Sequence, residues 1–449
     1  MPVKAFGLLA STAILLGTAL VQPAAAQVFY PQSTMLENGM QLVVLPNHRA
    51  PVVTHMIWYK TGALDDPWGK SGIAHFLEHL MFKGTPKYPQ GAYSQLISNM
   101  GGTENAFTSY DYTAYYATVG REHLAKIMEL ESDRMANWQV TDQQVAVERE
   151  VILKERQQRT ENDPVSAFFE EVNAVLYPNH PYQRPVIGWR HEMKTLNKQD
   201  AQRYVHDRYA PNNAVLVISG DIELPEAKAL AKEYYEPIAP RDLNRRSFAK
   251  TIAMDSHRTL EKSSPLVRET IWSRHRLVSA ARPETIGQSD ALSVLQKILG
   301  DNRTGRLYRR LVVQDKIATS AGISFSPVGY GPQRLAIVVT PLPGTSLETI
   351  EKTVDQEIAR LLQHGVTEQE VKNATGAMET EAVYARDSVS GPAMAVGRAL
   401  VSGLDLETVE AWPARMKAVT KGSVDKAAKN LFDDSGKWVT AILKPEAGK

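Results

Sequence analysis

The chain has 449 residues, 43% of them apolar, and its 51 lysines and arginines nearly balance 50 aspartates and glutamates. A chain of this length exceeds one ordinary hydrophobic core, so we expect two or more domains. The near-neutral charge argues against binding of nucleic acid through overall charge. The lack of cysteine excludes disulfides, a cysteine-linked lipid anchor and thiolate ligands for a metal.

The first 26 residues have the pattern of a secretory signal peptide. Lys4 precedes an apolar run from Ala5 to about Val21, and the small residues Ala24 and Ala26 predict cleavage after Ala26. An uncleaved membrane anchor is the alternative interpretation. No later stretch is long and apolar enough to span a bilayer, and the lack of cysteine suits a bacterial periplasm, so we expect a mature periplasmic protein.

The expected elements of the first half alternate between strands and helices. Ser71 is expected to cap a helix that ends at Gly84, and Thr141 begins a longer helix through the capping box T-D-Q-Q. The full order is a strand pair within residues 35–63, a helix over 71–84, a strand pair over 101–119, a helix over 141–159, a buried strand over 209–222 and an amphipathic helix after it.

The second half repeats the order of the first. VTDQQV at residues 140–145 recurs as VTEQEV at residues 366–371, 226 residues later, and each copy opens a helix after a strand–helix block. A matching order at a fixed offset predicts two duplicated halves that each combine strands with helices. The predicted boundaries are residues 27–236 for the first domain, 237–264 for a charged linker and 265–449 for the second domain.

The stretch HFLEHLMFKGT, residues 75–85, places three polar groups in an otherwise apolar helix. His75 and His79 are four residues apart and share one helical face, so their imidazoles can hold one metal ion. Glu78 borders that face, where a base can act on a water molecule. H-x-x-E-H is the inverted form of the zinc-protease motif H-E-x-x-H, and two histidines at the edge of a core are the structural alternative.

A catalytic zinc site usually takes three protein ligands, so a carboxylate or a further histidine must complete this one. Glu148 and Glu155 are seven residues apart, which is two helical turns, and they share a face of the helix that begins at Thr141. Glu150 lies on another face. Ordinary solvation of a charged helix is the usual explanation of such a pair, so the spacing alone does not identify the third ligand.

Together these motifs resemble the pitrilysin or insulinase family of metallopeptidases. Glu155 follows His79 by 76 residues, and the resemblance extends to GGTENAFTSYDYTAYY, YPNHPYQRPVIG and YAPNNAVLVISGD. The most similar branch is the short-subunit one, which includes the mitochondrial processing peptidase. The resemblance implies an α+β fold in which two homologous halves, each a mainly antiparallel sheet with helices packed on it, enclose a cavity. It also implies one zinc ion per chain, bound by His75, His79 and Glu155.

The activity that this resemblance implies is endopeptidase hydrolysis of short or unfolded polypeptides. Glu78 would be the general base, and Glu148 would orient a ligand or the base. Asn105, Ala106 and Phe107 match an edge strand that takes a peptide by strand addition, in which main-chain hydrogen bonds provide affinity. Another divalent metal in place of zinc and a non-catalytic scaffold subunit are the alternatives, although the intact motif argues against a scaffold.

The resemblance also bears on partners. In the family, an arginine and a tyrosine seven residues apart help hold the substrate at the metal, but here Arg268 is followed seven residues later by His275. The missing tyrosine predicts a heterodimer with a companion chain that supplies the pair, and a homodimer is the next alternative. The second half carries no H-x-x-E-H motif, so we expect only the first half to bind metal.

Overall fold

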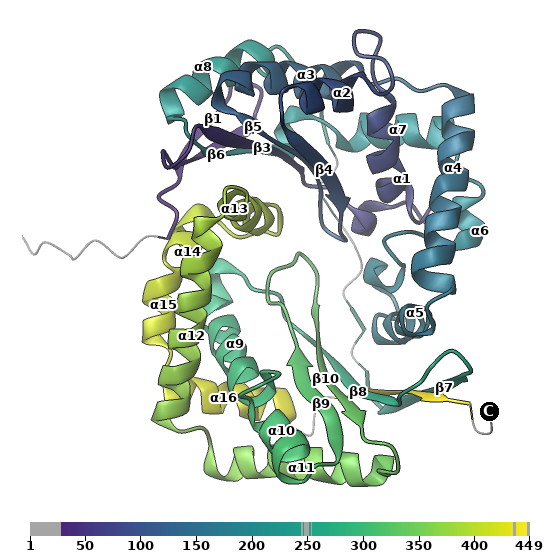
Figure 1. Ribbon diagram of the computed structural model, residues 1–449, viewed down its shortest axis with the longest axis vertical. Coiled ribbons are helices and arrows are strands. Elements are labelled where there is room, and N and C mark those ends of the chain that lie inside the picture. Colours follow the sequence, from purple (N-terminus) through teal and green to yellow (C-terminus); the bar gives the residue numbers. More distant parts are fainter. Residues whose placement is uncertain (1–27, 244–245, 247–250, 253, 434–436, 447–449) are drawn as a thin grey trace, which may run out of the picture.

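The computed structural model describes residues 28–243, 246, 251–252, 254–433 and 437–446, so the predicted signal peptide lies outside the described residues. Two β-sheets face each other, with helices between them and on their outer sides (Figure 1). The predicted architecture of two sheet-and-helix halves is therefore confirmed. Within the described ranges, no helix combines the length and the hydropathy that crossing a bilayer requires.

The first sheet has six strands in the order β1-β2-β6-β3-β5-β4. Its central strand β3 pairs antiparallel with β5 and β6, whereas β2 pairs parallel with β6. The strand β4 is the last in the order, so it is the edge strand that the sequence predicts. The strands are β1 (Gln32–Met35), β2 (Gln41–Pro46), β3 (Val52–Tyr59), β4 (Thr103–Thr108), β5 (Thr113–Gly120) and β6 (Ala214–Gly220).

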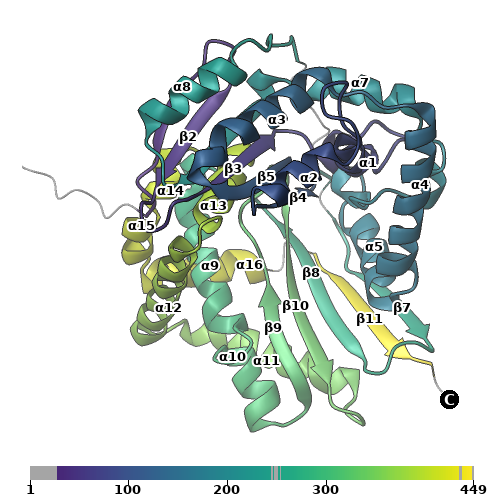
Figure 2. The same ribbon diagram turned by 45° about the horizontal axis from the view of Figure 1, so that its top comes forward.

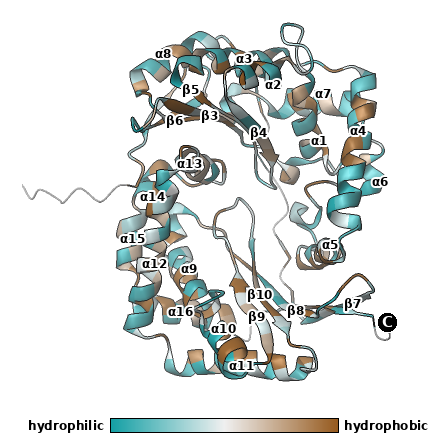
Figure 3. Ribbon diagram, viewed as in Figure 1, coloured by the Kyte–Doolittle hydropathy of each residue, from teal (hydrophilic) through white to brown (hydrophobic). Residues whose placement is uncertain are grey.

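Most helices of the first half cover the outer face of this sheet. Phe76 of α1 and Ile127 of α3 belong to one buried core with Ile57 and Tyr115 of the strands. Figure 3 shows mainly hydrophobic strands beneath helices that also carry hydrophilic surface. The helices are α1 (Ile73–Leu80), α2 (Ala92–Asn99), α3 (Leu124–Asn137), α4 (Asp142–Arg156), α5 (Pro164–Leu176), α6 (Arg190–Met193), α7 (Lys198–Arg208) and α8 (Leu224–Tyr234).

Two helix ends differ from the predictions. Helix α1 begins after Gly72, which has a φ of +85°, and the hydroxyl of Ser71 instead accepts a hydrogen bond from the amide of Trp189. The prediction that Ser71 caps α1 is therefore wrong. The capping box at Thr141 is confirmed for α4, but α-helical bonding ends at Arg156, and a π-helical turn, Gln157–Glu161, continues the chain.

The second sheet has five strands in the order β7-β11-β8-β10-β9 (Figure 2). Thr367 forms a capping box at the start of α12, as Thr141 does for α4, which agrees with duplicated halves. The last seven residues of the predicted linker form the strand β7. The sequence analysis did not predict this strand, because its mostly polar residues give no apolar pattern. The elements are β7 (Arg258–Ser264), β8 (Ile271–Val278), β9 (Ala318–Ser324), β10 (Gln333–Pro341), β11 (Val439–Pro445), α9 (Ile286–Gly300), α10 (Arg306–Tyr308), α11 (Leu347–His364), α12 (Glu368–Asp387), α13 (Gly391–Val401), α14 (Leu406–Glu410), α15 (Trp412–Ala418) and α16 (Lys421–Phe432).

One helix of each half packs on the inner face of the other half's sheet (Figure 1). Helix α13 packs on β3 and β6, where Val396 shares a buried cluster with Trp58. In the opposite direction, α5 packs on β7, β8 and β11, where Phe168 shares a cluster with Val439. This exchange joins the halves through buried apolar contacts, which are the main favourable term in folding.

The contact of α13 with the first sheet depends on a small residue. A Cβ atom at Gly397 would collide with the indole ring of Trp58. We expect Gly397→Ala to lower the free energy of unfolding by about 1–3 kcal/mol through overpacking, measured by urea denaturation. The matched control is Gly376→Ala in α12, where the space is open, and alanine should there stabilise the helix slightly. An equal effect of both changes would contradict close packing at Gly397.

Candidate metal centre

Helix α1 is held in place by its apolar face and by its N-terminus. Phe76, Leu77 and Leu80 are fully buried in the core of the first half. The buried carboxylate of Asp66 accepts hydrogen bonds from the amides of Gly72 (2.7 Å) and Ala74 (3.1 Å). These are amides that lack partners within a helix, so Asp66 caps α1 from outside it. The polar residues of the motif therefore stand on a firmly anchored helix.

Helix α4 packs against α1 and brings a carboxylate to the two imidazoles. The Oε2 atom of Glu155 lies 3.4 Å from Nε2 of His79 and 3.9 Å from Nε2 of His75. These ligand atoms all lie within 4.8 Å of one another, and the three side chains are partly buried. Two imidazole nitrogens and one carboxylate oxygen form a donor set that suits zinc, so the residues fit this metal.

The acid–base properties of the two histidines reflect their carboxylate neighbours. Burial lowers the pKa of His75, and the charge of His79 lowers it further. Burial also lowers the pKa of His79, but hydrogen bonds to Glu148 and Glu155 raise it overall to about 9. The cluster therefore attracts positive charge, and a divalent metal would displace a proton from it.

The structure separates the roles that spacing left open for the two glutamates of α4. Glu148 faces Nδ1 of His79 at 2.9 Å, on the side of the ring opposite to the Nε2 that faces Glu155. The other oxygen of Glu148 forms an ion pair with Lys83. Although burial opposes it, hydrogen bonds from His79 and Lys83 hold the pKa of Glu148 below its ordinary value. Glu148 is thus placed to orient His79, and Glu155 to bind metal.

Glu78 has a partner that sequence reasoning missed. The hydroxyl of Thr108 donates a hydrogen bond of 2.5 Å to Oε2 of Glu78. Thr108 is the last residue of β4, two positions after Ala106, so both side chains point to the face that α1 covers. Burial raises the pKa of Glu78 above its ordinary value, although the hydrogen bond from Thr108 opposes the shift. A signal was available in the period-two alternation of TENAFT.

The other predicted residues are distributed over both sheets. Asn105 and Phe107 lie on the inner side of β4, where Phe107 packs edge-on against Trp58, whereas Ala106 lies on the side of α1. His275 is buried in β8, and its Nε2 pairs with the hydroxyl of Ser273 at 2.8 Å. It therefore does not offer its side chain to a ligand.

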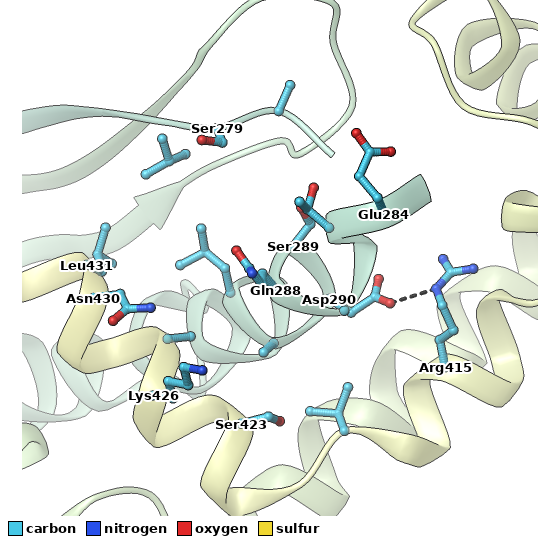
Figure 4. Close-up of a pocket in the computed structure, with 18 of the residues that line it drawn as sticks. Ser279, Glu284, Gln288, Ser289, Asp290, Arg415, Ser423, Lys426, Asn430 and Leu431 are labelled. Carbon is cyan, nitrogen blue, oxygen red and sulfur yellow. Dashed lines mark hydrogen bonds and ion pairs between the residues drawn. The ribbon is translucent and has the colours of Figure 1, made fainter. Parts of the chain in front are cut away.

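A cavity lies away from this cluster, in the second half. It has a volume of about 750 Å³ and opens between α9 and α16, with the ion pair of Asp290 and Arg415 at one end (Figure 4). Its lining combines polar side chains such as Gln288 and Lys426 with apolar ones such as Leu431. Its lining residues include no histidine, so this cavity is not the metal centre.

Comparison with known families agrees with the metal centre. The family model described as "Insulinase (Peptidase family M16)" matches residues 42–189. The model described as "Peptidase M16 inactive domain" matches residues 195–378. The chain belongs to the insulinase family. The inactive-domain match agrees with a second half that lacks the metal motif. The fold prediction made from the resemblance is thereby confirmed at the level of the family.

Relatives of similar length exist for this insulinase-family chain. The zinc protease PqqE of Helicobacter pylori is 25% identical over 428 residues, which cover 94% of each chain. The crystal structure of a protease from Helicobacter pylori superposes with a TM-score of 0.86 at 25% identity and covers 93% of this chain and 100% of that one. The first half of the periplasmic protease PqqL from Escherichia coli shares the fold, with a TM-score of 0.79 at 20% identity over 93% of each chain.

Proposed function

We propose that this chain is a zinc-dependent endopeptidase that hydrolyses short or unfolded polypeptides in the periplasm. The observation that carries the proposal is the cluster of His75, His79 and Glu155, with the partly buried carboxylate of Glu78 on the helix that carries the two histidines. The name of the relative PqqE as a zinc protease supports it. The N-terminal sequence supports export, and the shared fold with periplasmic PqqL is consistent with that location.

The residues of the site divide the chemistry among them. Zinc bound by His75, His79 and Glu155 would supply Lewis acidity toward a water molecule and the scissile carbonyl. Glu78 takes a proton from that water as it attacks, and then gives the proton to the leaving amine. Burial keeps the pKa of Glu78 raised, which makes its carboxylate a stronger base, and Thr108 fixes one of its oxygens.

We place the peptide along the open edge of β4, by strand addition. Asn105, Ala106 and Phe107 lie on this edge strand, and its last residue, Thr108, contacts Glu78. A peptide paired with β4 would therefore run past the base. Main-chain hydrogen bonds would provide most of its affinity, which suits an enzyme that accepts many sequences.

We further propose that a companion chain or a second copy completes the substrate site, because buried His275 cannot replace the expected tyrosine. The test is cleavage by the purified chain alone, with its oligomeric state measured by light scattering. Full peptide cleavage by a monomer would refute this part of the proposal.

The function itself is tested with purified residues 27–449 and a library of quenched fluorescent peptides. We expect cleavage that a chelator abolishes and that one equivalent of zinc restores. A chain that binds zinc yet cleaves nothing would point to a missing partner chain. A chain that neither binds zinc nor cleaves would refute the proposal and favour a scaffold.

We expect Glu148→Gln to weaken zinc binding by about 10–100-fold, because it removes the charge that orients His79 and fixes its tautomer. The measurement is competition for zinc with a chelator of known affinity. Glu150→Gln removes the same charge at an exposed position of this helix outside the cluster and serves as the matched control. An unchanged zinc affinity in Glu148→Gln would show that Glu148 does not support the centre.

We expect Thr108→Val to lower kcat by about 10- to 150-fold, because the loss of a hydrogen bond to a charged group costs about 1.5–3 kcal/mol and leaves Glu78 free to turn. Thr108→Ser keeps the hydroxyl and should restore most of the rate. Steady-state kinetics on one peptide would check both variants. Equal rates for valine and serine would contradict a role for the hydroxyl.

A further inference from the structure

We propose that Arg159 binds the substrate and selects peptides that carry a carboxylate close to the cleaved bond. The inference rests on the proposed function and names a substrate class for it. Nη1 of Arg159 lies 2.5 Å from Oε1 of Glu155. The other oxygen of Glu155, Oε2, faces the imidazoles of His75 and His79. The guanidinium therefore stands directly beside the metal cluster.

Arg159 is accessible, unlike the arginine three residues before it. The Arg156 side chain is 7% exposed and donates to Glu170 and to the carbonyl of Gly188, which identifies it as a structural anchor. The Arg159 side chain is 75% exposed. Its closest contact with Glu155 is through Nη1, and a guanidinium with five N–H donors at this exposure remains accessible to a ligand.

The backbone beneath Arg159 is fixed although its side chain is exposed. Arg159 lies in the π-helical turn Gln157–Glu161, which packs against α5 and buries the side chain of Thr160. The amide of Asn162 closes this turn on the carbonyl of Gln157 at 2.8 Å. Single π-turns within helices occur frequently at functional sites. The turn holds Arg159 at the end of the helix face that carries Glu155.

A carboxylate is the ligand that this arrangement favours. Bound zinc and Lys83 would balance the charges of the carboxylates of Glu78, Glu148 and Glu155. The guanidinium of Arg159 therefore adds a positive charge at the site with which an acidic substrate can pair. Guanidinium groups bind carboxylates through two parallel hydrogen bonds, and the exposed guanidinium of Arg159 presents N–H groups of this geometry to solvent. A substrate carboxylate can pair with these groups. It can belong to an acidic side chain or to the C-terminus of the peptide.

The test uses quenched peptides that share one cleavable core. Each position beside the cut bond carries Glu, Gln or Lys in turn, and the C-terminus is free or amidated. We expect the zinc-loaded wild type to cleave its preferred Glu peptide about tenfold faster, in kcat/KM, than the Lys peptide. Arg159→Glu should reverse this ratio. A preference lost on amidation, but not on exchange of Glu for Gln, would assign the carboxylate to the C-terminus.

The control is Lys154→Glu, which makes the same charge change at an exposed position of α4 outside the cluster and should leave the ratio unchanged. Equal ratios in the wild type and Arg159→Glu would overturn the proposal. A change in zinc affinity alone would also overturn it, because Arg159 would then only orient Glu155.

A binding measurement separates this proposal from the proposed function. Fluorescence anisotropy of labelled Glu and Lys peptides is followed in the zinc-loaded Glu78→Gln variant, with Arg159 intact or changed to Glu. An Arg159-dependent preference in binding, with no cleavage by the zinc-loaded wild type, would support the role of Arg159 and refute cleavage by this chain alone. Cleavage by the wild type with no Arg159-dependent preference in either measurement would support the peptidase function and refute the role of Arg159.

Discussion

Glu78→Gln is expected to lower kcat for peptide hydrolysis by about two to four orders of magnitude, the range for loss of a general base. Glutamine keeps the size of the side chain and can still accept the hydrogen bond from Thr108, but its amide does not take up a proton. The ligand atoms of His75, His79 and Glu155 are unchanged, so zinc content should equal that of the wild type. Steady-state kinetics and elemental analysis on the same preparation measure both quantities.

The control for this variant is Glu150→Gln, which removes a carboxylate from an exposed position of α4. Its kcat should be close to that of the wild type, because Glu150 lies outside the cluster. A Glu78→Gln variant that retains full kcat and full zinc would exclude Glu78 as the base. Loss of zinc together with activity would instead give Glu78 a role in building the centre.

Glu155→Ala is expected to abolish both zinc binding and cleavage. The change removes the oxygen that lies 3.4 Å and 3.9 Å from the two imidazole nitrogens, and two histidines alone leave a three-ligand site incomplete. Zinc affinity should fall by more than the roughly 10–100-fold expected for a residue that only supports a ligand. Competition with a chelator of known affinity measures the change, and circular dichroism checks that the fold is retained.

The matched control is Glu150→Ala on the same helix, which should bind zinc like the wild type. Wild-type zinc content in Glu155→Ala would mean that another group completes the centre. In that case the assignment of Glu155 as third ligand would be wrong, whatever the effect on cleavage.

The candidate site could be predicted from sequence only where its geometry is local. His75 and His79 meet because residues four apart on one helix are neighbours. The approach of Glu155 depends on how α4 packs on α1, which spacing does not encode, so its role came from the family resemblance. For the same reason, Thr108 was missed, because its contact with Glu78 becomes visible only when the strand and the helix are placed in space. Arg159 and Glu155 are four residues apart, but the position of Arg159 beside the metal cluster depends on the packing of α4 on α1.

The fold, like the candidate site, could be predicted from sequence only where its signals are local. The duplication was readable because the capping boxes at Thr141 and Thr367 are local signals that recur at one offset. The helix cap at Ser71 was predicted wrongly because Asp66, a residue from the preceding loop, takes that role. Apolar periodicity shows that a helix has a buried face, but not which sheet covers it. The exchange of α5 and α13 between the halves could therefore not be predicted.

That exchange sets an order for the folding of the chain. All six strands of the first sheet precede β7, whereas α13, which covers their inner face, follows β10. Trp58 and its neighbours on that face therefore become buried only when α13 is present, and α13 follows four of the five strands of the second sheet in the chain. The first half therefore cannot complete its folding before the second half, whereas independent domains usually fold one after the other. Until α13 packs on it, the inner face of the first sheet exposes apolar surface, which favours aggregation of the incompletely folded chain.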